Sequence, residues 1–294
     1  MALSGGTALA VKVSMRFFTL LPLMLAGCAG AAATLPSATL PAPSRTAASG
    51  SEPSQPPASS PAPSAFDSLH PHCVAQLFFG EARVSLASCG EAVGELSVEG
   101  TWRNFMPTGE GNDGREFEGF EVLGHYGRGE ALRYLVNGGG TGNFTGVMVV
   151  TVEGSELVRH DIVAPGDRCN GGLVAAYMDG EALIVAQSIT PADVVEASEG
   201  GRALHLVAYE HLDASASSCV AEARYRWVNG ASTLLDITFT EAPSYPAEWT
   251  NRFAFQSCFN SLVASRIEAG QGTLTPLALE AFTQDFAARC TSPE

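Results

Sequence analysis

The sequence has little positive charge. Among its 294 residues, 16 are lysine or arginine and 31 are aspartate or glutamate, so the formal net charge is -15 at pH 7. Lys12 is the only lysine. Because a surface this acidic repels phosphate backbones and anionic headgroups, we expect no nucleic-acid partner and no membrane attachment through a basic patch.

Motifs of several enzyme classes are also missing. The chain contains no G-x-S-x-G, H-E-x-x-H or S-x-x-K sequence and no Gly-Lys-Ser/Thr phosphate loop. It contains no C-x-x-C pair, and its cysteine spacings fit no zinc motif. We therefore expect no metal and no cofactor, and an enzyme would have to be of an unrecognised type.

The N-terminus has the features of an export signal. Residues 1–16 carry Lys12 and Arg16 and no acid, and residues 17–26 form the apolar run FFTLLPLMLA. This run has the length of a signal-peptide core and is too short to cross a bilayer as a permanent helix. We predict that residues 1–27 are removed, which takes two cations from the net charge of -15 and leaves the mature chain near -17.

The apolar run ends in Leu25-Ala26-Gly27-Cys28, which resembles the lipobox of bacterial lipoproteins. In that family the matching cysteine receives diacylglycerol on its sulfur and, after cleavage, a fatty acyl group on the new amino terminus. The resemblance implies anchoring in a membrane through Cys28, since each buried CH2 contributes about 0.8 kcal/mol and several chains are attached. Ala29 stands where the inner-membrane retention signal usually has aspartate, so the resemblance favours the outer membrane, facing the periplasm.

The segment after the lipobox has a low-complexity composition. Residues 28–65 are almost entirely Ala, Pro, Ser, Thr and Gly, with Arg45 and Glu52 the only charges. Such a segment cannot bury enough apolar surface to offset its ordering entropy, so we predict a disordered tether of roughly 35 Å average span. It serves either as a spacer or as a tolerated tail, and residues 66–294 form the globular part.

Six cysteines remain in the globular part, and an even number in an exported chain predicts disulfides. Residues 74–79 and 83–88 are expected to form a hairpin that sets Cys73 beside Cys89. Amphipathic patterns from Phe255 to about Gly270 and after Thr275-Pro276 predict a C-terminal helical hairpin, within about residues 247–290. The expected pairs are Cys73 with Cys89, Cys258 with Cys290 and, by elimination, Cys169 with Cys219.

Between these ends the dominant signal is β. Short apolar or alternating runs are separated by turn sequences such as Asp179-Gly180 and Asn229-Gly230, both strong hairpin signals. The pattern predicts a mainly β fold, an antiparallel sandwich or barrel-like domain with the helical hairpin packed on it. The expected strands are 131–136, 145–152, 156–163, 173–178, 182–188, 204–209, 220–228 and 233–239.

Two loops combine glycine with polar side chains. The first, from Asn137 to Gly146, contains a variant of the dinucleotide-binding glycine spacing, but a strand follows it where that motif needs a helix. The second, residues 167–172, places an acid, a base and an amide beside a cysteine. These loops either face a ligand or merely contain ordered turns, and their candidate binding residues are Asn137, Thr141, Asn143, Asp167, Arg168 and Asn170.

Other polar residues give weaker signals. His70-Pro71-His72 offers two metal ligands, which are too few for a site, and the acidic run from Glu110 to Glu121 lacks the ligand order of a calcium loop, so we expect a solvated loop there. A hydrolase would need a nucleophile near a histidine, and otherwise the histidines make ordinary hydrogen bonds. The candidate general bases are His160, Asp161, His205 and His211.

The sequence therefore favours a lipid-anchored envelope protein whose β domain is a non-catalytic binding module for an envelope protein or a small molecule. The alternatives are a periplasmic hydrolase of unrecognised type and a structural or assembly factor of the envelope.

Changing Cys28→Ser should abolish lipid attachment, because the thiol is the only group there that can form the thioether. Intact-mass analysis of the membrane-extracted protein should show a diacylglyceryl-modified amino terminus at residue 28 in the unaltered chain. Ala29→Ser, which keeps the thiol, should retain the modification. A water-soluble, unmodified product from the unaltered chain would contradict the lipoprotein assignment.

Overall fold

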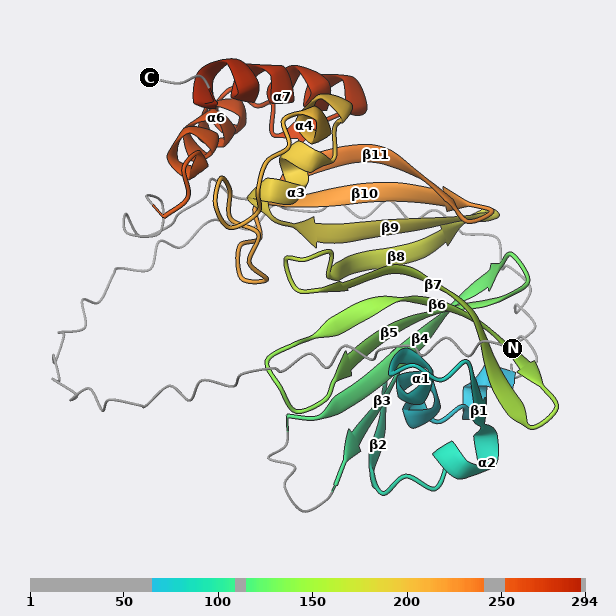
Figure 1. The fold of residues 1–294 in the computed structure, drawn as a ribbon. Coiled ribbons are helices and arrows are strands. Elements are labelled where there is room, and N and C mark those ends of the chain that lie inside the picture. Colours follow the sequence, from blue (N-terminus) through green and yellow to red (C-terminus); the bar gives the residue numbers. More distant parts are fainter. Residues whose placement is uncertain (1–64, 109–114, 241–251, 292–294) are drawn as a thin grey trace, which may run out of the picture. The chain divides into compact units, whose positions relative to one another are not determined.

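The described part of the chain forms two antiparallel sheets and several helices. The computed structural model describes residues 65–108, 115–240 and 252–291. Cys28, the expected signal peptide and all but the last residue of the expected tether lie outside these ranges. The expected fold class is confirmed, since the chain is mainly β, contains three disulfides and ends in a pair of packed helices (Figure 1).

The larger sheet, sheet A, has seven strands in the order β1-β7-β6-β5-β4-β3-β2. Successive strands from β2 to β7 are neighbours, so this part is a simple meander with β2 at one edge. The bounds are β1 (Arg83–Ser85), β2 (Gly94–Glu99), β3 (Trp102–Pro107), β4 (Phe117–Tyr126), β5 (Gly129–Asn137), β6 (Phe144–Glu153) and β7 (Glu156–Asp167).

The smaller sheet, sheet B, has five strands in the order β12-β11-β10-β9-β8. Asn229 and Gly230 both have positive φ, 51° and 79°, as a type I′ hairpin requires. Seven of the eight expected strands are confirmed across the two sheets. The bounds in sheet B are β8 (Leu173–Asp179), β9 (Ala182–Ile189), β10 (Ala221–Val228), β11 (Ala231–Phe239) and β12 (Thr273–Leu274).

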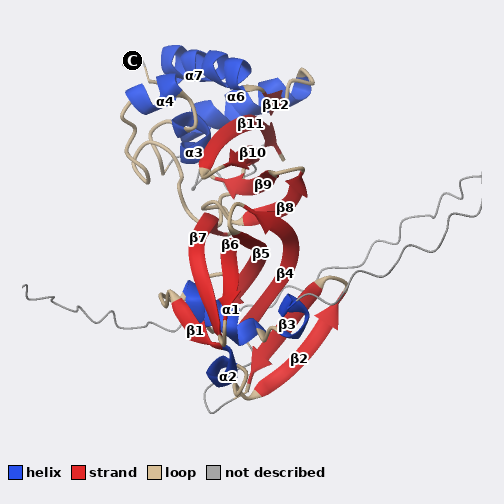
Figure 2. Ribbon diagram, turned by 90° about the vertical axis from the view of Figure 1, so that its right-hand side faces the viewer, coloured by secondary structure: helices blue, strands red, loops and turns tan. Residues whose placement is uncertain are grey.

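Sheet A curls around α1 (Pro71–Phe78), as Figure 2 shows. The helix begins because His70 caps it, accepting a hydrogen bond from the backbone N–H of His72, and because Pro71 occupies its first turn. Its buried face, which includes Val74 and Leu77, packs with Phe120 and other side chains of the sheet. The inner face of sheet A is thereby covered over its central strands.

Two further cores connect the remaining elements. Val147 and Val149 of β6 pack with Leu183 and Val185 of β9, so the other face of sheet A is covered by sheet B. Beyond β10 and β11 lie the helices at the top of Figure 1, which supply buried aromatic side chains such as Phe282. These helices are α3 (Pro191–Glu196), α4 (Glu199–Ala203), α6 (Gln256–Glu268) and α7 (Pro276–Cys290).

All three expected disulfides are present, but one expected local structure is wrong. Cys73 and Cys89 are bonded with their Cα atoms 5.1 Å apart, yet the segment between them is not a hairpin. It contains α1, the short strand β1 and the one-turn helix α2 (Leu86–Cys89). The cap and proline at the start of α1 favour helix over the apolar run that predicted a strand.

The strand expected at 204–209 is also wrong. His205 and Tyr209 have φ values of 52° and 65°, which interrupt an extended backbone, and only an isolated bridge joins Ala208 to Leu212. The expected solvated loop from Glu110 to Glu121 is wrong from Phe117 onward, where β4 begins, and residues 109–114 lie outside the described ranges.

Breaking the Cys169–Cys219 bridge should lower the free energy of unfolding by about 4 kcal/mol, because it closes a loop of 50 residues. Either Cys169→Ala or Cys219→Ala alone removes the bridge. The double variant should therefore unfold with nearly the same free energy as the less stable single variant, differing by no more than the cost of one small side chain. Denaturant unfolding measures all three. Fully additive losses would contradict a native bridge.

Candidate functional site

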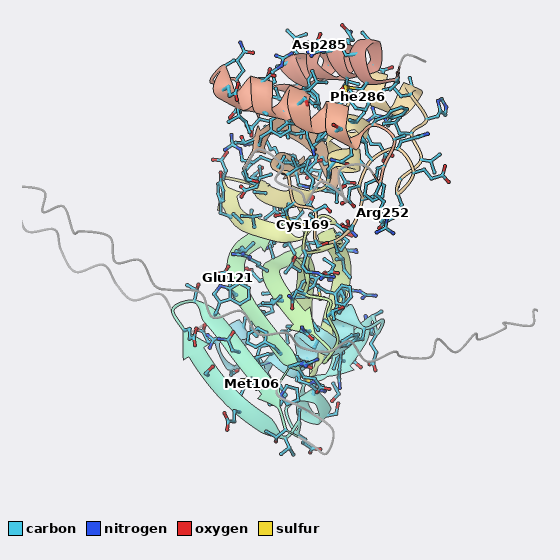
Figure 3. All side chains as sticks on the ribbon, turned by 90° about the vertical axis from the view of Figure 1, so that its left-hand side faces the viewer. Met106, Glu121, Cys169, Arg252, Asp285 and Phe286 are labelled. Atoms are coloured by element: carbon cyan, nitrogen blue, oxygen red, sulfur yellow. A yellow bond between two sulfur atoms is a disulfide. The ribbon has the colours of Figure 1, made fainter. Side chains whose placement is uncertain are left out.

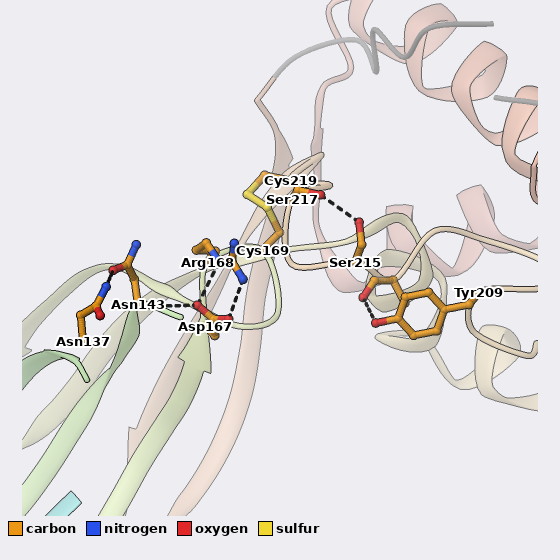
Figure 4. Close-up of polar contacts among 10 residues, drawn as sticks. Asn137, Asn143, Asp167, Arg168, Cys169, Tyr209, Ser215, Ser217 and Cys219 are labelled. Carbon is orange, nitrogen blue, oxygen red and sulfur yellow. Dashed lines mark hydrogen bonds and ion pairs between the residues drawn. A yellow bond between two sulfur atoms is a disulfide. The ribbon is translucent and has the colours of Figure 1, made fainter. Parts of the chain in front are cut away.

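The two loops singled out by the sequence lie side by side, as Figure 4 shows. They meet because β6 begins where β7 ends, with Phe144 paired to Asp167. The backbone N–H of Asn143 donates to Asp167 Oδ1 at 2.8 Å, and Asn137 Nδ2 donates to Asn143 Oδ1 at 2.9 Å. Thr141 is exposed on the first loop.

The charged residues of these loops bind each other. Arg168 donates from Nε and Nη2 to the two carboxylate oxygens of Asp167, at 3.1 and 3.0 Å. The Arg168 guanidinium, together with the Asn143 N–H, lowers the pKa of Asp167. Asn170 closes the turn through two backbone hydrogen bonds with Asp167. The candidate groups are thus largely occupied with ordering the loops.

The glycine-rich loop has a packing role at its end. Gly146 lies within β6 opposite Tyr134, and a Cβ at this position would come within 2.6 Å of the Tyr134 hydroxyl oxygen. The last glycine of the nucleotide-like spacing therefore leaves room for the buried ring of Tyr134. A pocket of about 160 Å³ lies beside the two loops, lined in part by Asn143, Arg168 and Cys219.

The histidines proposed as general bases are not brought together. His160 Nε2 is 2.8 Å from the Thr151 hydroxyl, and among the described residues no carboxylate contacts its second ring nitrogen. Asp161 accepts from the backbone N–H of the next residue. His205 Nδ1 lies 2.7 Å from the Ala203 carbonyl oxygen, and His211 accepts from the Val207 N–H and stacks on Phe255. Each ring is held locally, without the base-and-orienter arrangement that nucleophilic catalysis uses.

A different site, missed by the sequence analysis, lies where the N-terminal segment faces the edge of sheet A. A pocket of about 330 Å³, which we call the N-terminal pocket, is roughly twice the volume of the one beside Arg168. Arg103 bridges its two sides by donating to Asp67 at 3.0 Å. Its lining residues are Asp67, Ser68, Leu69, His70 and Pro71 from the N-terminal segment and Leu96, Ser97, Val98 and Arg103 from the sheet.

The sheet side of this pocket is formed by the edge strand β2. All six residues of β2 are exposed, including Leu96 at 62% and Val98 at 66%. Both side chains continue the inner face of the sheet, since Leu96 pairs with the buried Phe105 and Val98 with Arg103. The alternation Glu95-Leu96-Ser97-Val98-Glu99 could have indicated this strand in the sequence. The alternating run is short, however, and neither face of the strand is buried.

A polar cluster stands behind the pocket. His72 Nδ1 lies 3.0 Å from both oxygens of Glu118, and Gln76 Nε2 lies 3.2 Å from His72 Nε2. Burial raises the pKa of Glu118, and the contact with His72 opposes this rise. His70 packs against Phe105 with ring centroids 4.5 Å apart, and its pKa is lowered by burial and by the nearby His72.

This cluster has too few ligands for a metal by the usual count. Within residues 65–108, 115–240 and 252–291, no group of three or more His, Cys, Asp or Glu side chains could hold an ion. The pair of His72 and Glu118 is explained by its role in joining α1 to β4.

His70→Asn should flatten the pH dependence of stability between pH 7 and 5. Because the folded pKa of His70 lies below 6.5, the unfolded chain binds its proton more readily, and the folded state loses stability as the pH falls through 6.5. Asparagine retains an N-cap acceptor without titrating. Urea unfolding at both pH values measures the change, and an unaltered pH slope in the variant would contradict it.

Comparison of the chain with protein-family models, with curated protein sequences and with solved structures finds no match. The site is therefore defined by its geometry alone. That geometry favours the free edge of β2 and the N-terminal pocket over the two loops, since the loop polar groups are occupied by one another.

Proposed function

We propose that this chain is an exported, lipid-anchored envelope protein whose β domain binds another macromolecule through β2 and the N-terminal pocket. Anchoring rests on the resemblance of the segment ending at Cys28 to a lipobox. The described ranges contain no helix long and apolar enough to cross a membrane.

The observation that carries the binding function is the exposed edge of sheet A. β2 lies at the edge of sheet A and has β3 as its neighbour on one side, so every second residue directs its backbone N–H and C=O away from β3. Among the described residues none forms a backbone hydrogen bond with the edge of β2 that points away from β3. Proteins usually shorten, bend or cover such an edge, because it is a template for another strand.

The apolar side chains beside this edge add a second reason. Leu96 and Val98 are exposed next to each other on one face and open onto the N-terminal pocket. Exposed apolar side chains that gather beside a concave surface are typical of binding sites, whereas scattered ones are not. The combination of a free backbone edge and an adjoining apolar pocket suits recognition by strand addition.

A photo-crosslinking residue at Leu96 should give one discrete covalent adduct in the cells that produce the protein, identifiable by mass spectrometry. The same residue at Tyr177, which is 50% exposed on β8, should not give that adduct. Adding Val98→Asp to the Leu96 probe should remove it, because a carboxylate then lies against the apolar pocket. Equal labelling at both positions, or none at Leu96, would refute the proposed function.

A further inference from the structure

The two faces of β2 differ in chemistry. Because side chains alternate along a strand, Leu96 and Val98 share the inner face, and Glu95, Ser97 and Glu99 share the outer face. The outer face continues across β3, where Glu95 is paired with Met106. Figure 3 shows this side of sheet A, with Met106 and, farther along the sheet, Glu121.

On the inner face, the N-terminal pocket begins at β2 itself. Leu96, Ser97 and Val98 form its sheet side, and the segment from Asp67 to Pro71 forms the opposite side. A strand added beyond β2 would lie about 4.8 Å from it and direct alternate side chains along this face. Those side chains have Leu96 and Val98 as neighbours, so apolar ones are favoured there.

On the outer face, the neighbours of an added strand are carboxylates. Glu95 and Glu99 are exposed, and neither has an ion-pair partner in the described part of the chain. Side chains of an added strand on this face would lie opposite or diagonal to them, at the distance where opposite charges stabilise a pair of strands. Basic side chains are therefore favoured on the outer face.

The same carboxylates disfavour a second copy of this chain. Two β2 strands paired about a two-fold axis perpendicular to the sheet keep their outer faces on one side. Glu95 and Glu99 of one copy would then stand among Glu95 and Glu99 of the other. Like charges on facing strands are destabilising, and the chain already carries a net charge of -15.

We infer that the partner is an extended polypeptide segment whose side chains alternate between apolar and basic, and that it pairs with the free edge of β2 as an added strand of sheet A. Its apolar side chains lie on Leu96 and Val98 at the N-terminal pocket, and its basic side chains meet Glu95 and Glu99. This inference rests on the proposed function and specifies the partner's chemistry.

Three synthetic peptides of nine residues test the inference on the full mature chain. The first alternates valine with arginine, the second alternates valine with glutamate, and the third has the composition of the first with its valines in one block. Fluorescence anisotropy should show binding of the first alone. A fourth peptide, the first with N-methyl groups on alternate backbone nitrogens along one edge, should lose binding because it cannot form the ladder.

Matched protein variants locate the site. Glu95→Gln/Glu99→Gln should weaken binding of the valine–arginine peptide by roughly fivefold, in keeping with two exposed ion pairs. Glu181→Gln/Glu196→Gln removes the same charge at exposed positions outside sheet A and should leave binding within about twofold, a control for net charge. Leu96→Ser should weaken binding of the peptide without changing its preference for arginine over glutamate.

Equal binding of the arginine and glutamate peptides, or equal loss in the two charge variants, would overturn the inferred partner chemistry. A concentration-dependent dimer that Leu96→Ser abolishes would make a second copy the occupant and overturn it as well. An adduct at Leu96 in cells together with failure of the peptides would leave the proposed function standing and reject this inference alone.

Discussion

The side chains of β6 alternate between two cores. Met148 and Val150 face α1, while Val147 and Val149 face β9 of the other sheet. Because both faces of this strand are buried, its neighbours in the middle of sheet A must be apolar as well, and few positions remain there for polar chemistry. The polar and exposed groups are consequently displaced to the ends of strands and to the edges of the sheet. The two polar loops lie at the ends of β5, β6 and β7, and the N-terminal pocket lies at the edge of sheet A.

This double burial also explains which parts of the fold could be predicted from sequence. A continuous apolar run such as that of β6 is a strong signal because both faces contribute to it, and Asn229-Gly230 marks a turn because both residues need positive φ. All three disulfide pairings were predicted, two from expected local geometry and the third by elimination, although the hairpin expected between Cys73 and Cys89 is wrong. The error between Cys73 and Cys89 arose because the mostly apolar run of residues 74–79 fits a buried helix as well as a strand, and the capping by His70 decides between them.

The missed strands have a common physical cause. β2 has no buried face, and β4 contains Gly119 and Gly124 together with a register shift between Val122 and Gly124. The alternation in β2 extends over only five residues and β4 has no sustained two-residue period, so their pairing depends on contacts with β3 and β5 that local sequence does not encode. The N-terminal pocket could not be predicted from local sequence for the same reason. Its pocket joins residues near 70 to residues near 97, and only the completed sheet brings these two segments together.

The glutamates of β2 admit a simpler explanation, in which they only prevent edge-to-edge aggregation. Protection of that kind is most effective when charge interrupts the apolar surface, yet Glu95 and Glu99 stand on the opposite face from Leu96 and Val98 and leave the apolar side open. Burying either apolar side chain contributes about 1.5–3 kcal/mol when complete, whereas an exposed ion pair contributes at most about 1 kcal/mol. In strand addition, burial of Leu96 and Val98 would therefore supply most of the binding free energy. Glu95 and Glu99 would favour basic over acidic partners and oppose the pairing of two copies. Both properties follow from placing two kinds of side chain on the two faces of one unpaired strand.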